Sequence, residues 1–460
     1  MKKREALILK LMISALILLF TLISYSSACD IGVVSAAKSA TGRPFIWKNR
    51  DHDMGWQQEI KYYKAKDAKV GGSLRIIDRT TLAEVSSGGV NESGFAICNT
   101  TVYEADPLHE LFANANTDLL AKALERCITV SDFDNYLATW HTESENKTKV
   151  ISGNFVVIDA HGGAALYEAY TGEGFSAYGA QIMVNKFDAN TVAEGFVVRT
   201  NSHQWINLKG DNDREIRAYN LFLSLSQTNR LSYRNVLIEV AKDICGDKAK
   251  TDPTNVETST CISRYMTNLA VVVDGVKNGD DPRLTTFWCN LGEPSVGVAT
   301  PHFPSAQKIS FFAWADNFYW EYIPRNFGPS CLLNQAINNM ELTLYDNNIG
   351  TIIFDWDNIL NSEVIDMDTT INYTQLLTVQ KWTIPLENSV INKTEEYLNN
   401  LRQNPNFISA DSLYKFSNYA CEYTYRNYLA GSSNFYQWNY SEDDDSNDGD
   451  DWWMWWIKNQ

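Results

Sequence analysis

Short apolar runs separated by turn residues fill most of the chain between residues 31 and 303. IGVVSA (31–36) and RPFIWK (43–48) flank the turn KSATG and predict a β-hairpin that begins close to Cys29. Further strand signals stand at 74–77, 86–100, 154–170, 195–201, 269–276, 285–292, 295–303 and 309–315. Helical spacing of apolar residues appears at 118–140, 213–225 and 233–243. Because turns join most neighbouring strands, we predict two sheets with helical layers outside rather than a parallel α/β sheet.

The character of the sequence changes after about residue 330. Asn-rich connectors alternate with helical patterns at 393–403 and 411–428, and residues 442–451 are mostly acidic and precede four tryptophans. We therefore expect a mixed or helical extension over 331–440. We interpret 441–460 as a disordered, solvated tail rather than a docking element.

The N-terminus has the composition of a secretion signal. Lys2, Lys3 and Arg4 precede an apolar run, Leu11 to Ile23, that is short for a membrane span. Ser26 and Ala28 provide small residues for cleavage before Cys29, so residues 1–28 are expected to be removed and the product to be secreted or extracytoplasmic. A bacterial lipoprotein is the alternative, but Ser26 stands where such signals usually carry an aliphatic residue.

The composition limits the classes of partner. The 460 residues carry a formal net charge of −17, which argues against nucleic acid or an anionic membrane surface. No second apolar run reaches spanning length, so no stable membrane span is expected once the leader is gone. Cys245 and Cys261, two of eight cysteines, bracket a polar stretch that suits a disulfide in an oxidising compartment.

The common catalytic and metal motifs are missing from the sequence. It contains no G-x-S-x-G, Walker loop, H-E-x-x-H or C-x-x-C, and the histidines are scattered. RDHD (50–53) is more typical of a turn with an ion pair than of a metal site, so we expect neither metal nor cofactor. Cys29 as a new N-terminus would carry both a thiol nucleophile and an α-amine, whose usual pKa of about 7.7–8.0 suits a base near neutral pH.

Several ordered blocks resemble the linear-amide hydrolases of the N-terminal nucleophile superfamily. The blocks are CDIGVVSAAKSATGRPFIWKNRDHD, GGVNESGFAICNT, GNFVVIDAHGGAALYEA, VRTNSH, DREIRAY and TFWCNLGEPSVGVATP, spread over residues 29–305. They are most similar to the isopenicillin-N acyltransferase and carcinine hydrolase group, and more distantly to choloylglycine hydrolases and penicillin V acylases. The resemblance implies an α+β fold, a four-layer αββα sandwich over 29–330, followed by the C-terminal extension.

The resemblance also implies roles for particular residues. Cys29 would be nucleophile and base, Asp51 would orient the α-amine, and Asn99 would donate to the oxyanion. Asn201 would serve the oxyanion hole or the amine network, and Arg217, with Arg214 as the other register, would steady the nucleophile's surroundings. Lys48 stands where choloylglycine hydrolases have an arginine, which argues against bile-salt-type recognition.

The implied activity is cleavage of a linear amide through a thioester on Cys29. The expected partner is a small amide or a short peptide, without a cofactor. Acyl transfer to an amine, a cysteine dipeptidase of the same superfamily, and a lipid-anchored non-catalytic surface protein remain as alternatives. Removal of the leader by signal peptidase or by self-cleavage is open, as is assembly into a homo-oligomer.

Overall fold

The computed structural model describes residues 29–52, 58–78, 85–102, 115–147, 149–171, 182–203, 212–314, 331–345 and 370–439. The expected leader (1–28) and acidic tail (441–460) lie outside these ranges. No helix in the described ranges is both long and apolar enough to cross a membrane.

Two antiparallel sheets form the centre of the molecule. Sheet A has the order β10 (Phe196–Arg199), β1 (Cys29–Val34), β2 (Phe45–Asp51), β12 (Thr267–Asp274), β13 (Thr286–Leu291), β14 (Thr300–His302). Sheet B runs in chain order through β3 (Gln58–Tyr63), β4 (Ser73–Asp78), β5 (Val85–Asn91), β6 (Ala96–Thr101), β7 (Ser152–Ile158), β8 (Ala164–Tyr170), β9 (Met183–Asp188). A separate pair joins β11 (Val256–Glu257) to β15 (Thr370–Ile371).

Strand alternation sorts the apolar side chains of the sheets into three layers of core. Ile31 and Val33 of β1 pack with Ile76 of β4 and Val156 of β7 between the two sheets. Ile97 and its neighbours on the opposite face of sheet B pack against α2 (Ala115–Arg126) and α3 (Val130–Thr139). The remaining layer covers the outer face of sheet A.

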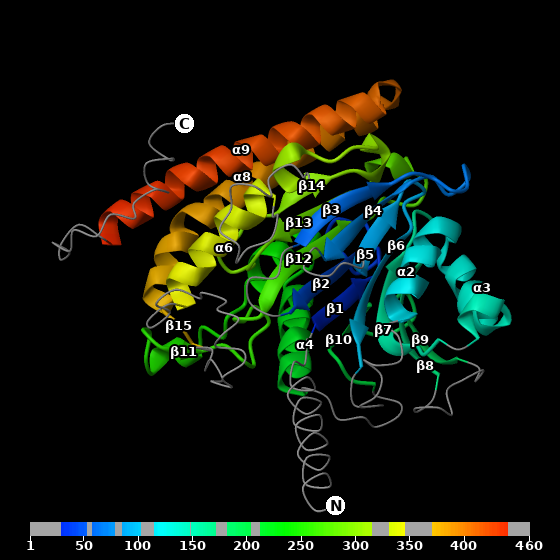
Figure 1. The fold of residues 1–460 in the computed structure, drawn as a ribbon, viewed down its shortest axis with the longest axis horizontal. Coiled ribbons are helices and arrows are strands. Elements are labelled where there is room, and N and C mark those ends of the chain that lie inside the picture. The colour runs from blue at the N-terminus through cyan, green and yellow to red at the C-terminus, as the bar shows by residue number, and fades with distance from the viewer. Residues whose placement is uncertain are drawn as a thin grey trace, which may run out of the picture.

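The helical layer on sheet A is large. It contains α4 (Asn212–Gln227), α5 (Tyr233–Asn235) with the π-helical turn Val236–Val240, α6 (Leu332–Tyr345), α8 (Tyr373–Gln403) and α9 (Ala410–Asn439). Trp47 and Trp288 of sheet A share one core with side chains from all of these helices. Figure 1 shows α8 and α9 along one side of the molecule and α2 and α3 on the opposite side, with the sheets between them. The fold is therefore the αββα sandwich predicted from the sequence.

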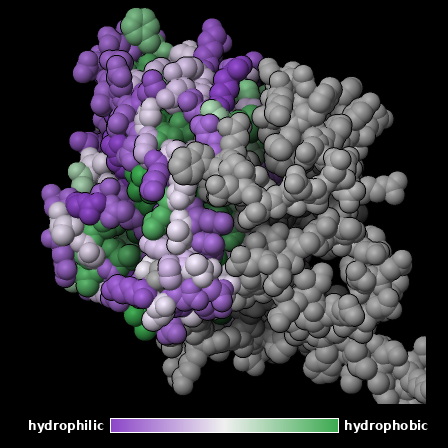
Figure 2. Space-filling view, turned by 90° about the vertical axis from the view of Figure 1, so that its left-hand side faces the viewer, coloured by the Kyte–Doolittle hydropathy of each residue, from purple (hydrophilic) through white to green (hydrophobic). Residues whose placement is uncertain are grey.

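Residues 331–345 and 370–439 belong to that outer helical layer. Leu376, Val390 and Tyr428 lie in the same core as the sheet A tryptophans, and Glu387 of α8 accepts a hydrogen bond from the Ala299 amide at 2.8 Å. Figure 2 views the molecule from the side of these helices, where hydrophobic residues form small patches between hydrophilic ones. The residues expected to form an extension thus contribute their apolar faces to the outer helical layer on sheet A.

One predicted strand is wrong. In the described part (309–314) of the apolar run ISFFAWA, Phe311–Ala313 form a 3₁₀ turn instead of a strand. The Ser310 hydroxyl accepts a hydrogen bond from the Phe312 amide, which stabilises the first turn of a helix. A short apolar run does not distinguish a strand from a buried turn.

Candidate active site

Cys29 is the first residue of β1, a strand with partners on both sides. Its Cα is paired with that of Arg50 on β2, and Ile31 is paired with Arg199 on β10. The alternation that places Ile31 and Val33 between the sheets gives the Cys29 side chain the same direction. The residue is 8% exposed. The sulfur therefore lies at one end of the space between the two sheets.

The backbone nitrogen of Cys29 is held by Asn201. It donates to Asn201 Oδ1 at 2.8 Å, and Arg214 Nη2 donates to the same oxygen at 3.2 Å. Asn201 Nδ2 donates to the Thr101 carbonyl at 2.6 Å. Because Arg214 can only donate and a carbonyl can only accept, these partners fix the orientation of the Asn201 amide. The amide oxygen therefore faces the nitrogen of Cys29.

A buried group of charges surrounds this contact from the outer face of sheet A. Arg214 Nη1 lies 2.9 Å from Asp51 Oδ2 and 3.3 Å from Asp30 Oδ2. Arg264 Nε donates to Asp51 Oδ2 at 2.8 Å, and Thr267 Oγ1 donates to Asp51 Oδ1 at 2.6 Å. Two arginines thus balance two aspartates, as buried charges require. The contacts of Asp51 within the described ranges connect it to Cys29 N through Arg214 and Asn201.

Lys48 approaches Cys29 from the inter-sheet side. The side chain is 1% exposed, and its ammonium donates to the Asn99 carbonyl. Burial lowers the pKa of Lys48, and the adjacent Cys29 sulfur acts in the opposite direction, since a negative sulfur favours the charged amine. Lys48 therefore lies close enough to Cys29 for its charge to act on the thiol.

Asn99 contributes its backbone to this region. Ala96 and Cys98 of β6 face the inter-sheet core, whereas Ile97 faces the helices α2 and α3. The same alternation directs the Asn99 side chain toward the helices rather than toward Cys29. A donation to an oxyanion at Cys29 from the Asn99 side chain, as expected from the sequence, does not fit this direction.

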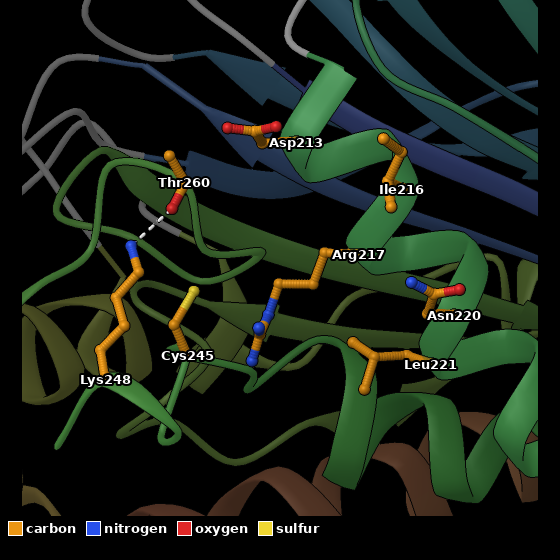
Figure 3. Close-up of a pocket in the computed structure, with 8 residues that line it drawn as sticks. All are labelled: Asp213, Ile216, Arg217, Asn220, Leu221, Cys245, Lys248 and Thr260. Atoms are coloured by element: carbon orange, nitrogen blue, oxygen red, sulfur yellow. Dashed lines mark hydrogen bonds between the residues drawn. The ribbon is translucent and has the colours of Figure 1, made fainter. Parts of the chain in front are cut away.

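Arg217 lies elsewhere on α4. Its guanidinium pairs with Asp243 and with Asp247, the latter at 3.2 Å. It lines a surface cavity of about 440 Å³ with Asp213, Ile216, Asn220, Leu221, Cys245, Lys248 and Thr260 (Figure 3). Arg214, one helical turn earlier, is the arginine that reaches Asn201 and Asp51. Of the two arginines that the sequence offered, Arg217 and Arg214, the structure therefore places Arg214 in the network around Cys29.

The structure thus gathers Cys29, Asp51 and Asn201 around Arg214. Sequence reasoning missed Arg264 and Asp30, because an arginine after a polar loop and an aspartate inside a strand carry no motif. The disulfide expected between Cys245 and Cys261 is present, and it closes the loop that precedes Arg264. Across the described ranges, no group of three or more His, Cys, Asp or Glu side chains is arranged to hold a metal ion.

Comparison with known proteins gave matches only among solved structures. No protein-family model and no curated protein matches the chain. An N-acylethanolamine-hydrolysing acid amidase ortholog from Caenorhabditis elegans is 12% identical, with a TM-score of 0.34 over 54% of this chain and 92% of that one. A variant of the conjugated bile acid hydrolase from Clostridium perfringens is also 12% identical, with a TM-score of 0.33 over 57% of this chain and 89% of that one. A second variant of that hydrolase is 13% identical, with a TM-score of 0.32 and the same coverage.

Proposed function

We propose that this protein is an exported hydrolase of linear amides that uses Cys29, freed as the N-terminal residue, as its nucleophile. The observation that carries the proposal is the 2.8 Å hydrogen bond from the Cys29 nitrogen to Asn201 Oδ1, within the buried network of Arg214 and Asp51. The resemblance of the sequence blocks to linear-amide hydrolases of the N-terminal nucleophile superfamily supports the same assignment.

The contacts of the Cys29 nitrogen allow a free α-amine at this position to act as a base. An α-amine that donates one N–H to the neutral Asn201 oxygen can direct its lone pair toward the thiol of the same residue. Arg214 and Arg264 neutralise Asp30 and Asp51, so the network leaves no uncompensated carboxylate to hold the amine in its protonated form. The amine is thereby prepared to take the thiol proton near neutral pH.

The proposed reaction proceeds in two halves. The α-amine takes the thiol proton while the sulfur attacks the amide carbonyl carbon, which gives a tetrahedral oxyanion. The α-ammonium then protonates the leaving amine as the C–N bond breaks, and a thioester on Cys29 remains. A water molecule, deprotonated by the α-amine, attacks the thioester. Collapse of the second tetrahedral species releases the acid, and the sulfur recovers its proton.

Hydrogen-bond donors near the sulfur can stabilise the oxyanion. Asn201 Nδ2 uses one hydrogen on the Thr101 carbonyl and retains a second one. The Lys48 ammonium lies beside the sulfur and carries three hydrogens, one of which is directed at the Asn99 carbonyl. Preorganised donors of this kind stabilise a developing negative charge without further rearrangement.

Two measurements on the exported protein test this proposal: hydrolysis of a panel of linear amides, and intact-mass analysis of the mature chain. Wild type should hydrolyse at least one substrate class, start at Cys29 without a lipid, and show a trapped acyl group at Cys29. Cys29→Ala should lose the activity by at least about 1000-fold. Cys127→Ala, a buried cysteine in the layer of α2 and α3, is the matched control and should retain it. Unchanged activity in Cys29→Ala, or a mature chain that begins at another residue, would overturn the assignment.

A further inference from the structure

Asn154 of β7 contacts the backbone of the segment that carries Asn201. Its side chain is fully buried, and Nδ2 donates to the Thr200 carbonyl at 2.9 Å and to the Ser202 carbonyl at 3.1 Å. These two carbonyls belong to the residues immediately before and after Asn201. One amide therefore holds the backbone on both sides of the side chain that contacts the Cys29 nitrogen.

Thr100 of β6 completes this clamp. Its hydroxyl donates to the Thr200 carbonyl at 2.6 Å and lies 3.1 Å from Asn154 Nδ2. Thr100 and Asn154 are paired across β6 and β7, so their relative position is set by the ladder of sheet B. The segment 200–202 follows β10 of sheet A. The clamp thus connects the two sheets at the point where Cys29 begins β1.

Stability alone is a weak reason for an asparagine at this site. Within the described part of the chain, Asn154 Oδ1 is buried and accepts no hydrogen bond. A buried acceptor without a donor costs about 1–3 kcal/mol, so the two donations of Nδ2 come at a cost to stability. The Asn154 amide instead holds the 200–202 segment. The position of that segment sets where Asn201 lies relative to the Cys29 nitrogen.

We propose that Asn154 is a positioning residue that sets the place of Asn201 relative to the Cys29 nitrogen. This inference rests on the proposed function, because it assigns Asn154 to the same reaction. Loss of the clamp lets the 200–202 segment shift, and a displacement of about 1 Å at a catalytic contact can reduce the rate about 100-fold. Asn154 acts only through Asn201, so its effect should vanish when Asn201 is already removed.

A double-mutant cycle tests this dependence. Asn154→Ala alone should lower kcat/KM by about 100-fold, mainly through kcat. In an Asn201→Ala background it should cause less than about a threefold further loss, because coupled residues are not additive. Thr100→Val, which keeps the side-chain shape, should cause a smaller loss with the same dependence on Asn201. Independent, multiplicative losses in the cycle would overturn the inference.

Asn91 offers the matched control. It is also a fully buried asparagine whose Nδ2 donates to two carbonyls, those of Leu124 and Cys127 at the end of α2. Asn91→Ala should lower the melting temperature, and any effect on kcat/KM should be the same with and without Asn201.

A direct structural readout separates the inference from the proposed function. If no Cys29-dependent turnover exists, the proposed function fails, and the clamp is judged from crystal structures of wild type and Asn154→Ala. A shift of Asn201 Oδ1 by about 1 Å or more away from the Cys29 nitrogen supports the role of Asn154. An unmoved Asn201 overturns it.

Discussion

At the scale of single residues, the free cysteines differ in their surroundings. Burial raises the pKa of Cys98, Cys127, Cys331 and Cys421 to about 12, and that of Cys289 well above its usual value. Thiols of this kind stay protonated near neutral pH and react slowly with electrophiles. Cys29 differs from them in its place at the first position of β1, where Asn201 holds its nitrogen, whereas Lys48 acts on the sulfur of Cys98 as well. It is the thiol that we expect to react.

Lys48→Met tests the contribution of this lysine. The substitution keeps the length and apolar stem of the side chain but removes the ammonium next to the sulfur. We expect alkylation of Cys29 by iodoacetamide near neutral pH to become about tenfold slower, because the variant loses the positive charge and the hydrogen-bond donor beside the sulfur. Peptide mass spectrometry of the alkylated chain gives the rate, and Cys29→Ala provides the background. An equal rate in Lys48→Met and wild type would show that the lysine does not act on the thiol.

At the scale of elements, the loop between Cys245 and Cys261 connects a disulfide to the charge network. Arg264 follows the second cysteine and donates to Asp51, and Asn49 of β2 donates to the carbonyl of Ile262 at 3.1 Å. The disulfide-closed loop therefore lies next to Arg264, one of the two arginines that balance the buried aspartates.

Cys245→Ser with Cys261→Ser should weaken the fold. A disulfide across 16 residues constrains the unfolded chain by about 3 kcal/mol, so the free energy of unfolding in urea should fall by about that amount. Dithiothreitol should reproduce the loss in wild type and leave the double variant unchanged. A similar response of both proteins to dithiothreitol would show that the loss does not come from the Cys245–Cys261 disulfide.

At the scale of the whole molecule, buried carboxyl groups make stability depend on pH. Burial raises the pKa of Glu293 to about 8, with Asp51 as a further contribution, and Glu341 of α6 is also raised well above its usual value. A folded-state pKa above the unfolded value means that the folded protein retains its proton more tightly. The stability from Glu293 is therefore complete below about pH 4.5 and is lost as the pH rises toward 8.

Glu293→Gln should remove this dependence, because the amide keeps the shape of the side chain and does not ionise. Thermal unfolding should give similar melting temperatures for the variant and wild type near pH 5, and a melting temperature roughly 3 °C higher for the variant near pH 8. Glu396→Gln on the exposed face of α8 is the control and should follow wild type at both pH values. Parallel curves for Glu293→Gln and wild type would mean that Glu293 is ionised in the folded protein.

The sequence by itself determined the layers of the fold and the place where its first strand begins. Turn-linked strands and amphipathic helices show which face of each element is buried, and that local pattern predicts two sheets with helical layers outside and a strand that begins close to Cys29. The tertiary structure alone decided the contacts that join distant segments. It placed Arg214 rather than Arg217 against Asn201, and it brought Lys48 close to Cys29. It joined Arg264 to Asp51 and Asn154 to the carbonyls on both sides of Asn201. It also extended α8 through Pro385, a residue that breaks helices in isolation, because both flanking parts of that helix bury apolar side chains. Local periodicity carries no information about which polar groups meet across the sheets. Buried charges and amides require hydrogen-bond or ion-pair partners, and only the tertiary packing decides which groups lie close enough to pair.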